Sequence, residues 1–559
     1  IISSVKQAAK YMDPIDAFKL SLKINQKGGF DCPGCAWPDP DDDRSALGEY
    51  CENGMKAIAE EATKKSVTAA FFKKYSVAEI SKFSDFKMGK LGRLTEPMVL
   101  REGATHYEPI AWEDAFKLVA KELNALDSPD EAIFYTSGRT SNEAAYLYQL
   151  FIRSYGTNNL PDCSNMCHES SGVGLSHTLG IGKGSVTLND LHEAEVIMIM
   201  GQNPGTNHPR MLGALEKCKQ NGGKIITVNP LPEAGLLNFT DPQSPIKMIQ
   251  GGTLLTDVFA PVKVNGDVAF LKAIMLKLEK MEEANPGNVL DWDFIKEHTH
   301  GFDNFLADLK KEDVQHAISE SGVEESIIIE VAEMMATNDK IIICWAMGLT
   351  QQKNGVGNIQ EVVNLLLMRG AIGKPGAGTC PVRGHSNVQG DRTMGIWESP
   401  KEAFLAALDR VHGIQAPREH GYHVVSAIEA MKAGRGKVFF AMGGNFLSAS
   451  PDTHYTADAL QNTVLTVHVS TKLNRSHLVT GKQALILPCL GRTDKDVQAD
   501  GEQFVSCENS MGVVQSSQGI LTPPNVLLKS EVAIVAGMAL ATLSDSRVNW
   551  IGMAGNYDK

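Results

Sequence analysis

The sequence has few cysteines, no excess of positive charge and no long apolar run, and each lack excludes a class of protein. Ten cysteines in 559 residues are too few for a disulfide scaffold. The formal charge of −13 argues against binding to nucleic acid or to an anionic membrane. No apolar run approaches the roughly 20 residues that a membrane span needs, and the longest, 532–543, is predicted to be a buried helix. We therefore expect a globular protein without membrane insertion.

The N-terminal segment 1–30 has neither the apolar stretch of a signal peptide nor a twin-arginine pair. Together with the sparse cysteines, this predicts a cytoplasmic protein. In a reducing compartment, a C-x-x-C motif is more typical of metal binding or redox chemistry than of a structural bridge. A chain of 559 residues is too long for one core, so roughly three or four domains are expected.

Short apolar runs alternate with helical stretches from about residue 111 onward. Runs of this kind are typical of parallel strands that are buried on both faces. They occupy residues 132–135, 195–200, 224–228, 341–345, 437–441, 464–467 and 485–487. The pattern predicts an α/β architecture with two doubly wound units, in which the loops after the strands lie at one edge of each sheet.

Loops rich in Gly, Asn and Pro follow several of these strands, at 201–210, 229–233, 347–351 and 442–445. Glycine allows a phosphate to approach the backbone closely, and the exposed N–H groups complement its charge. A G-x-G-x-x-G turn is absent after 195–200, and Asn229 occupies the position where a nicotinamide enzyme needs a carboxylate. The loops therefore favour a dinucleotide other than NAD. Simple tight turns of α/β units remain the alternative.

Cys32 and Cys35 form a C-x-x-C motif among prolines, and Cys51 is a third candidate ligand. A zinc ribbon would need a second C-x-x-C, and a thioredoxin-like motif would begin a helix. The spacing favours metal binding over inert structural cysteines.

Cys167 and His168 are adjacent. A thiolate is a soft ligand for a redox-active metal, and an imidazole beside it can move a proton. A cysteine or a histidine considered alone is more often a residue of the protein core than a metal ligand or a proton-transfer group. Arg383 lies in a Gly-rich segment, where anion binding is favoured over a surface salt bridge.

These motifs form an ordered series that resembles the molybdopterin (bis-MGD) oxidoreductases, in particular formate dehydrogenase alpha subunits. Segments 135–143 and 162–169 are similar to the YdeP-type branch. The resemblance implies a multi-domain formate dehydrogenase/DMSO reductase-like fold with a small N-terminal cluster-binding domain. The expected domains are an Fe–S-type domain at 1–95, a discontinuous α/β domain at 96–162 and 386–559, and a Rossmann-like domain at 163–385 that carries the metal-ligating cysteine. The C-terminal domain that closes over the cofactor in the family is not expected in this chain.

The resemblance also implies a cofactor, Mo-bis(molybdopterin guanine dinucleotide), with Cys167 as the molybdenum ligand. His168 would take part in proton movement, and Arg383 would hold a substrate carboxylate. The residues expected to bind the cofactor are Gly201, Asn203, Pro204, Asn207, Asn229, Gly348, Gln351, Gly384, Gly443, Gly444, Asn445 and Lys472.

A [4Fe–4S] cluster would be held by Cys32, Cys35 and Cys51, and this set departs from the family's pattern. The third cysteine of the family's motif falls on Asp39, so the expected cluster is ligated by three cysteines, ligated with help from this aspartate, or labile. The family's lysine between cluster and pterin falls on Asn53, with Lys56 as a candidate substitute.

The implied reaction is oxidation of formate to carbon dioxide, with two electrons passing through a pterin and the cluster to an unknown acceptor. Two alternatives stay open. One keeps the cofactor and changes the small substrate. The other is a non-catalytic scaffold or stress-related relative.

Overall fold

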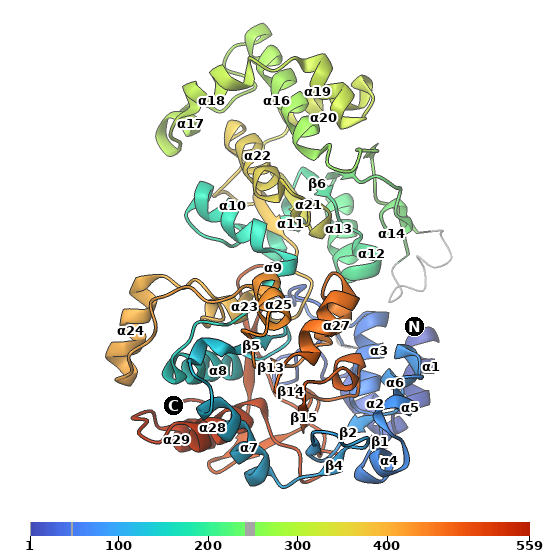
Figure 1. The fold of residues 1–559 in the computed structure, drawn as a ribbon. Coiled ribbons are helices and arrows are strands. Elements are labelled where there is room, and N and C mark those ends of the chain that lie inside the picture. The colour runs from blue at the N-terminus through green and yellow to red at the C-terminus, as the bar shows by residue number, and fades with distance from the viewer. Residues whose placement is uncertain (1, 46–47, 241–251) are drawn as a thin grey trace.

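The computed structural model describes residues 2–45, 48–240 and 252–559, and it contains two large sheets that lie one above the other in Figure 1. The upper sheet is parallel and has the order β10-β7-β6-β11-β12. Its strands are β6 (Val196–Met200), β7 (Lys224–Val228), β10 (Val258–Ala260), β11 (Ile341–Trp345) and β12 (Gly378–Pro381).

The lower sheet is mixed and has the order β4-β3-β15-β14-β13-β5. The strands β5 (Ala132–Thr136), β13 (Val438–Met442), β14 (Leu465–Ser470) and β15 (Gln483–Pro488) are parallel. β3 (Met98–Leu100) pairs antiparallel with β15, and β4 (Glu108–Pro109), at the edge of the sheet, pairs antiparallel with β3. The carboxyl ends of the parallel strands in both sheets lead into the loops that form the candidate site.

A topological switch lies between β6 and β11 in the upper sheet. From β6 the chain moves to β7 and β10 on one side, and it returns to β11 and β12 on the other side. Ligands of open α/β sheets bind in the crevice outside the carboxyl ends of strands at such a switch. The loops that begin at Gly201 and Ala346 therefore form the expected position for a ligand.

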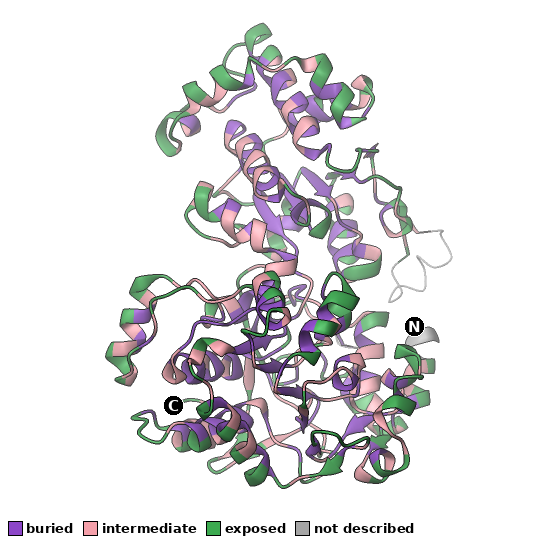
Figure 2. Cartoon of the chain, viewed as in Figure 1, coloured by how far each residue is buried: buried purple, intermediate pink, exposed green. Residues whose placement is uncertain are grey.

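Residues of the upper sheet alternate between two apolar cores, because successive side chains of a strand point to opposite faces. Val196, Met198 and Met200 pack with helices α16 (Asp267–Ala284), α20 (Glu325–Ala336) and α22 (Gly355–Met368). Ile197 and Ile199 face α13 (Met211–Gln220). Figure 2 shows the strands as buried between these helices. Burial on both faces explains why the apolar runs are continuous.

The lower sheet is covered in the same way. Phe134 and Phe440 pack with α7 (Trp112–Asn124), α8 (Asn142–Tyr155) and α28 (Glu531–Thr542), whereas Phe439 lies on the opposite face with α25 (Val424–Lys432) and α27 (Thr453–Gln461). α28 is the helix predicted from the longest apolar run, and most of its residues are buried.

Five helices inserted between β10 and β11 form the top of the molecule in Figure 1. They are α16, α17 (Trp292–His298), α18 (Phe302–Leu309), α19 (Val314–Ser321) and α20. The N-terminal segment contains α1 (Ile2–Tyr11), α2 (Pro14–Ser21), α3 (Glu52–Glu61), α4 (Ala69–Lys74), α5 (Val77–Ile80), α6 (Asp85–Gly89) and a small sheet of β1 (Ser66–Val67) with β2 (Arg93–Leu94).

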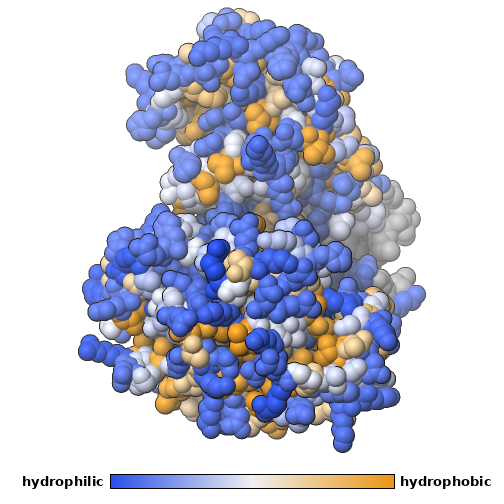
Figure 3. All heavy atoms as spheres, in the orientation of Figure 1, coloured by the Kyte–Doolittle hydropathy of each residue, from blue (hydrophilic) through white to orange (hydrophobic). Residues whose placement is uncertain are grey.

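The predicted α/β fold class is confirmed, and all the predicted strands are present. The division at 1–95, 96–162 with 386–559, and 163–385 stays a prediction. None of the helices in 2–45, 48–240 and 252–559 is long and apolar enough to cross a membrane. Figure 3 shows a mainly hydrophilic face on which apolar side chains are scattered among charged ones.

Candidate functional site

Two cavities lie where the loops after the strands meet, with volumes of about 780 and about 620 Å³. The first is bordered by loops that follow strands of the upper sheet and by the N-terminal segment around Cys32. The second is bordered by loops that follow strands of the lower sheet and by the end of α3. Ala57, Arg139 and His385 line both cavities, so the two cavities adjoin.

Most of the residues predicted from the sequence border one of these cavities. The first is lined by Cys32, Cys35, Cys51, Cys167, His168, Gly201, Asn203, Asn207, Asn229, Gly348, Gln351 and Gly384. The second is lined by Gly443, Gly444, Asn445 and Lys472. Pro204 and Arg383 are not among the lining residues of either cavity within the described ranges. The roles of all these residues toward a cofactor stay predictions.

Gly201 and Gly348 bring the loops after β6 and β11 into backbone contact. The Gly348 N–H donates to the Gly201 carbonyl at 3.0 Å, and Gly201 has a positive φ of 56°. A Cβ atom on Gly348 would lie 2.5 Å from the Gly201 Cα. Both glycines are therefore required for the loops to meet at the topological switch, independently of any ligand.

Cys167 is the last residue of α9 (Ser164–Cys167) and is 7% exposed. Burial raises the pKa of its thiol, and the nearby Arg383 guanidinium opposes this effect. The Thr350 hydroxyl donates to the Cys167 carbonyl at 2.6 Å, and the Gln351 side-chain amide donates to the Met166 carbonyl at 2.5 Å. The loop after β11 thus fixes the backbone of Cys167. Thr350 was not among the predicted site residues, although it lies in the predicted loop 347–351, and Gln351 was predicted only as a cofactor contact.

His168 is buried, and both of its ring nitrogens have partners. Nε2 donates to the Val382 carbonyl at 3.1 Å, and Nδ1 lies 2.9 Å from the Ser171 hydroxyl, which also accepts from the Trp345 indole N–H. The hydroxyl can therefore donate to Nδ1, which places the ring proton on Nε2. Burial holds the pKa of His168 well below its usual range. The ring is neutral, and movement of a proton through it requires that one of these hydrogen bonds is exchanged.

Arg383 is buried beside Cys167, but its hydrogen bonds run to the backbone. Its guanidinium donates to the Gly182 carbonyl at 3.0 Å and to the His168 carbonyl at 3.4 Å. Burial lowers the pKa of Arg383 to about 10. The guanidinium therefore secures the segment that carries Cys167 and His168. Its Nε has no hydrogen-bond partner among the described residues, so a substrate carboxylate that binds Nε alone leaves the carbonyl contacts in place, whereas a bidentate contact competes with them.

Cys32, Cys35 and Cys51 share one wall of the first cavity. Cys51 caps α3, with its Sγ accepting from the Gly54 N–H at 3.3 Å, and a Cβ atom on Gly54 would lie 2.9 Å from Cys32 Sγ and 3.8 Å from Cys51 Sγ. Burial raises the pKa of the Cys32 thiol, and it raises that of Cys35 to about 11. In the part of the chain that is described, no three His, Cys, Asp or Glu side chains are arranged to hold a metal ion.

The residues at the positions that depart from the family's cluster motif contact other parts of the chain. The Asp39 carboxylate accepts from Arg210 and from the Gln515 amide, both at 2.8 Å, so both of its oxygens are engaged away from the cysteines. The Asn53 amide lines the cavity and donates to the Thr206 carbonyl at 2.7 Å. Lys56 pairs with Glu52 at 2.5 Å. In this arrangement neither Asp39 nor Lys56 faces a cluster held by the cysteines.

Lys472 lines the second cavity, but its charge is already balanced. Its Nζ lies 2.7 Å from the Glu60 carboxylate, which also pairs with Lys90. Binding of an anion to Lys472 therefore competes with Glu60.

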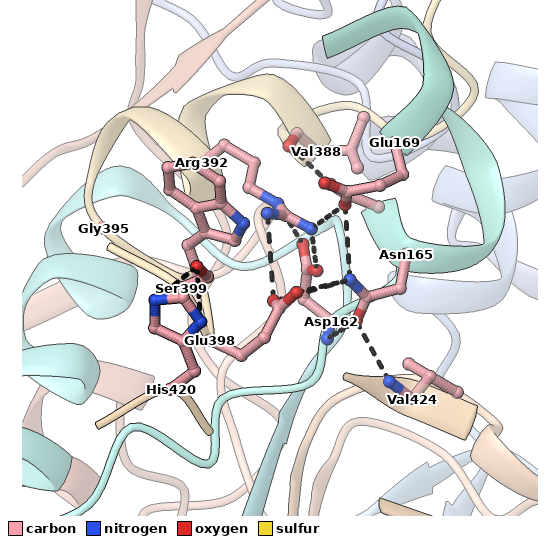
Figure 4. A network of polar contacts seen from close by, with 12 residues as sticks. Asp162, Asn165, Glu169, Val388, Arg392, Gly395, Glu398, Ser399, His420 and Val424 are labelled. Atoms are coloured by element: carbon pink, nitrogen blue, oxygen red, sulfur yellow. Dashed lines mark hydrogen bonds and ion pairs between the residues drawn. The ribbon is translucent and has the colours of Figure 1, made fainter. Parts of the chain in front are cut away.

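A buried ion network connects the segment of Cys167 with the segment of Arg383 (Figure 4). Arg392, on α23 (Val388–Thr393), contacts both oxygens of Asp162 at 2.8 and 3.3 Å and also pairs with Glu169. Glu398 lies 4.0 Å from the same guanidinium. Asp162 immediately precedes Cys163, and Glu169 follows His168, so one arginine fixes both ends of the segment that contains Cys167. No sequence signal identified Arg392.

Asp162 is expected to make stability depend on pH. Burial raises its pKa to about 6, and Glu169 adds to this effect while Arg392 opposes it. Since the folded protein binds this proton more tightly than the unfolded chain, the stabilisation is complete below about pH 4 and is lost as pH rises through about 6. The loss is on the order of 3 kcal/mol, at about 1.4 kcal/mol for each unit of pKa.

The measurement is the melting temperature of the wild type relative to Asp162→Asn between pH 4 and 7. The wild type should lose stability relative to the variant as pH rises. A difference that is constant with pH, or that changes in the opposite direction, would show that Asp162 is ionised throughout.

Comparisons with known proteins agree with the geometry. The sequence model described as molybdopterin oxidoreductase matches residues 93–479. An uncharacterized oxidoreductase of Mycobacterium tuberculosis is 53% identical over all of this chain and 72% of its own length, and Protein YdeP of Escherichia coli is 45% identical over all of this chain and 74% of its length.

One more distant relative and one solved structure are also similar to this chain. The alpha subunit of an F420-dependent formate dehydrogenase of Methanococcus maripaludis is 29% identical over 72% of this chain and 56% of its own length. Acetylene hydratase from Pelobacter acetylenicus has a similar fold, with a TM-score of 0.60, 17% sequence identity, and coverage of 83% of this chain and 62% of that chain.

Proposed function

Because the chain belongs to the molybdopterin oxidoreductase family, we propose that it is a molybdenum-dependent enzyme that oxidises formate to carbon dioxide. The observation that carries the proposal is the Cys167 thiol, which lines a cavity built by Gly-rich loops at the switch point of an α/β sheet. A buried thiol at this position can ligate a redox-active metal, and the adjoining cavities have room for an extended ligand.

The lining residues fit a molybdopterin cofactor. The loops after β6, β7 and β11 would hold one dinucleotide in the first cavity, and the segment Gly443–Asn445 with Lys472 would hold the second in the other cavity. Both Gly443 and Gly444 have positive φ values, 73° and 80°, which leaves their backbone open to close approach of a phosphate. When bound, the metal and pterins would supply two-electron redox chemistry.

The protein groups have roles that follow from their contacts. Thr350 and Gln351 hold the backbone of Cys167 in place. His168 stays neutral and can pass a proton to or from a partner that replaces the Ser171 hydroxyl at Nδ1. Arg383 would bind the formate carboxylate through its guanidinium fork, with the unpartnered Nε donating directly and an Nη group exchanging its carbonyl contact.

Formate as the substrate is supported by the sequence pattern of Cys167, His168 and Arg383 and by the likeness to a formate dehydrogenase alpha subunit. We further propose that electrons leave through an iron–sulfur cluster held by Cys32, Cys35 and Cys51, in a cytoplasmic protein. This assignment is supported by the three cysteines that line the first cavity, two of which, Cys32 and Cys51, have their sulfurs beside Gly54. Asp39 does not provide a fourth ligand.

The test is a combined measurement of metal content and activity on protein produced in a host with a complete cofactor pathway. Molybdenum or tungsten together with iron, and formate-dependent reduction of a dye, are the expected results. If the protein binds the metal and acts on another small substrate but not on formate, formate is the wrong substrate and the metal assignment stands. A protein that never takes up molybdenum or tungsten would overturn the proposal in favour of a non-catalytic scaffold.

A further inference from the structure

Arg139 lies at the junction of the two cavities. It belongs to the loop between β5 and α8, and its side chain lines both cavities. Its neighbour Gly138 allows the loop to pack tightly, because a Cβ atom there would lie 2.6 Å from Cys163 Sγ and 2.9 Å from the His385 Cβ. The packing places the Arg139 side chain between the N-terminal segment and the loop that follows β12.

Arg139 differs from the other lysine and arginine side chains that line the cavities. Arg210 pairs with Asp39 and Glu49, Lys472 with Glu60, and Arg492 with Asp31, whereas Lys263 donates to the Ser319 carbonyl. For Arg139, the described residues provide neither an ion pair nor a hydrogen-bond acceptor for the guanidinium. It is the uncompensated cation of the site.

The guanidinium of Arg139 is open to the space of the cavities, because the residue is exposed. Burial of the surrounding site lowers the pKa of Arg139, and the nearby Arg492 acts in the same direction, whereas Cys32, Cys163 and Glu61 raise it. None of these groups forms an ion pair or a hydrogen bond with the guanidinium among the described residues. His385 beside it is neutral, because burial and Arg139 itself lower its pKa to about 4. The guanidinium is therefore free to contact a ligand of opposite charge.

We propose that Arg139 binds an oxyanion, a phosphate or a carboxylate, of the ligand at the junction of the two cavities. A guanidinium forms two parallel hydrogen bonds to either group. The proposal rests on the proposed function in one respect, since the phosphate would belong to the dinucleotide cofactor and the carboxylate to the substrate. Arg139 requires no exchange of existing contacts to bind this group, whereas Nη1 and Nη2 of Arg383 already donate to carbonyls.

The experiment uses the full chain without its cofactor, titrated in a calorimeter at low ionic strength with inorganic pyrophosphate and, separately, with sodium formate. Wild type, Arg139→Gln, Arg139→Lys and the control Lys263→Gln are compared. Wild type should bind at least one titrant, Arg139→Gln should bind it about tenfold or more weakly, and Lys263→Gln should bind as the wild type does. Arg139→Lys should recover binding only in part, because an ammonium lacks the planar fork.

A melting curve of each variant without titrant excludes a purely structural role. Removal of an exposed cation that has no ion pair or hydrogen-bond acceptor among the described residues should leave the melting temperature of Arg139→Gln nearly unchanged. Binding of pyrophosphate assigns the site to a phosphate, and binding of formate assigns it to a carboxylate.

The inference is overturned if wild type binds neither anion, or if Arg139→Gln binds them as tightly as wild type does. Because the titration needs no metal, its result is separate from the proposed function. A protein that binds pyrophosphate through Arg139 and never takes up molybdenum would refute the enzyme assignment alone.

Discussion

Replacement of Cys167 with serine is expected to abolish turnover without loss of the fold. The change exchanges one buried sulfur for oxygen in a side chain whose backbone is held by Thr350 and Gln351. If the thiolate ligates the metal, activity per bound metal should fall by at least about 100-fold, since even the loss of an outer partner of a metal ligand costs about 10- to 100-fold.

Cys218→Ser is the matched control for this variant. Cys218 is also fully buried, but it lies in α13, where its Sγ donates to the Ala194 carbonyl. This variant should keep its activity per bound metal. Equal activity of Cys167→Ser and wild type would remove Cys167 from the reaction.

The second large effect is expected from Gly348→Ala, which should disrupt the contact between the loops after β6 and β11. The new Cβ atom would lie 2.5 Å from the Gly201 Cα and 2.6 Å from the Gly201 carbonyl oxygen. These are backbone atoms at a residue with a positive φ, so they cannot move aside as a flexible side chain can. Overpacking of this kind costs about 1–3 kcal/mol or more, and it displaces two walls of the first cavity.

The melting temperature and the metal content of Gly348→Ala should both fall. Gly357→Ala is the control, because Gly357 lies within α22 and a Cβ atom there would have nothing within 4 Å. That variant should be neutral or slightly more stable, by up to about 1 kcal/mol. Equal melting temperatures of Gly348→Ala and Gly357→Ala would show that the close contact between Gly201 and Gly348 does not require glycine at position 348.

The fold was predictable where a segment is buried on both faces. The runs at 196–200 and 341–345 contain only apolar residues because helices cover both sides of the sheet. The strand β12 was not predicted, since Gly378 and Pro381 are typical of turns and the strand pairs with β11 alone. β10 and the antiparallel strands β3 and β4 are only two or three residues long, too short for a periodic pattern.

The position of the site was predictable to a similar extent. Parallel strands bring their carboxyl ends to one edge, and the loops after β6, β7 and β11 do line one cavity. The partners of the polar groups were not predictable, because they come from distant parts of the chain. Asp39 is engaged by Gln515, and Lys472 by Glu60. Arg139 has no such partner among the residues that the structure describes, and the sequence could not show this.

The central claim is that Cys167 ligates a metal in the cavity between the two sheets, and X-ray absorption at the molybdenum edge tests it most directly. Spectra of the isolated wild-type protein and of Cys167→Ser should both show a sulfur-rich metal site, with one sulfur ligand fewer in the variant. Identical metal coordination in the two proteins, or a wild-type protein without molybdenum or tungsten, would contradict it.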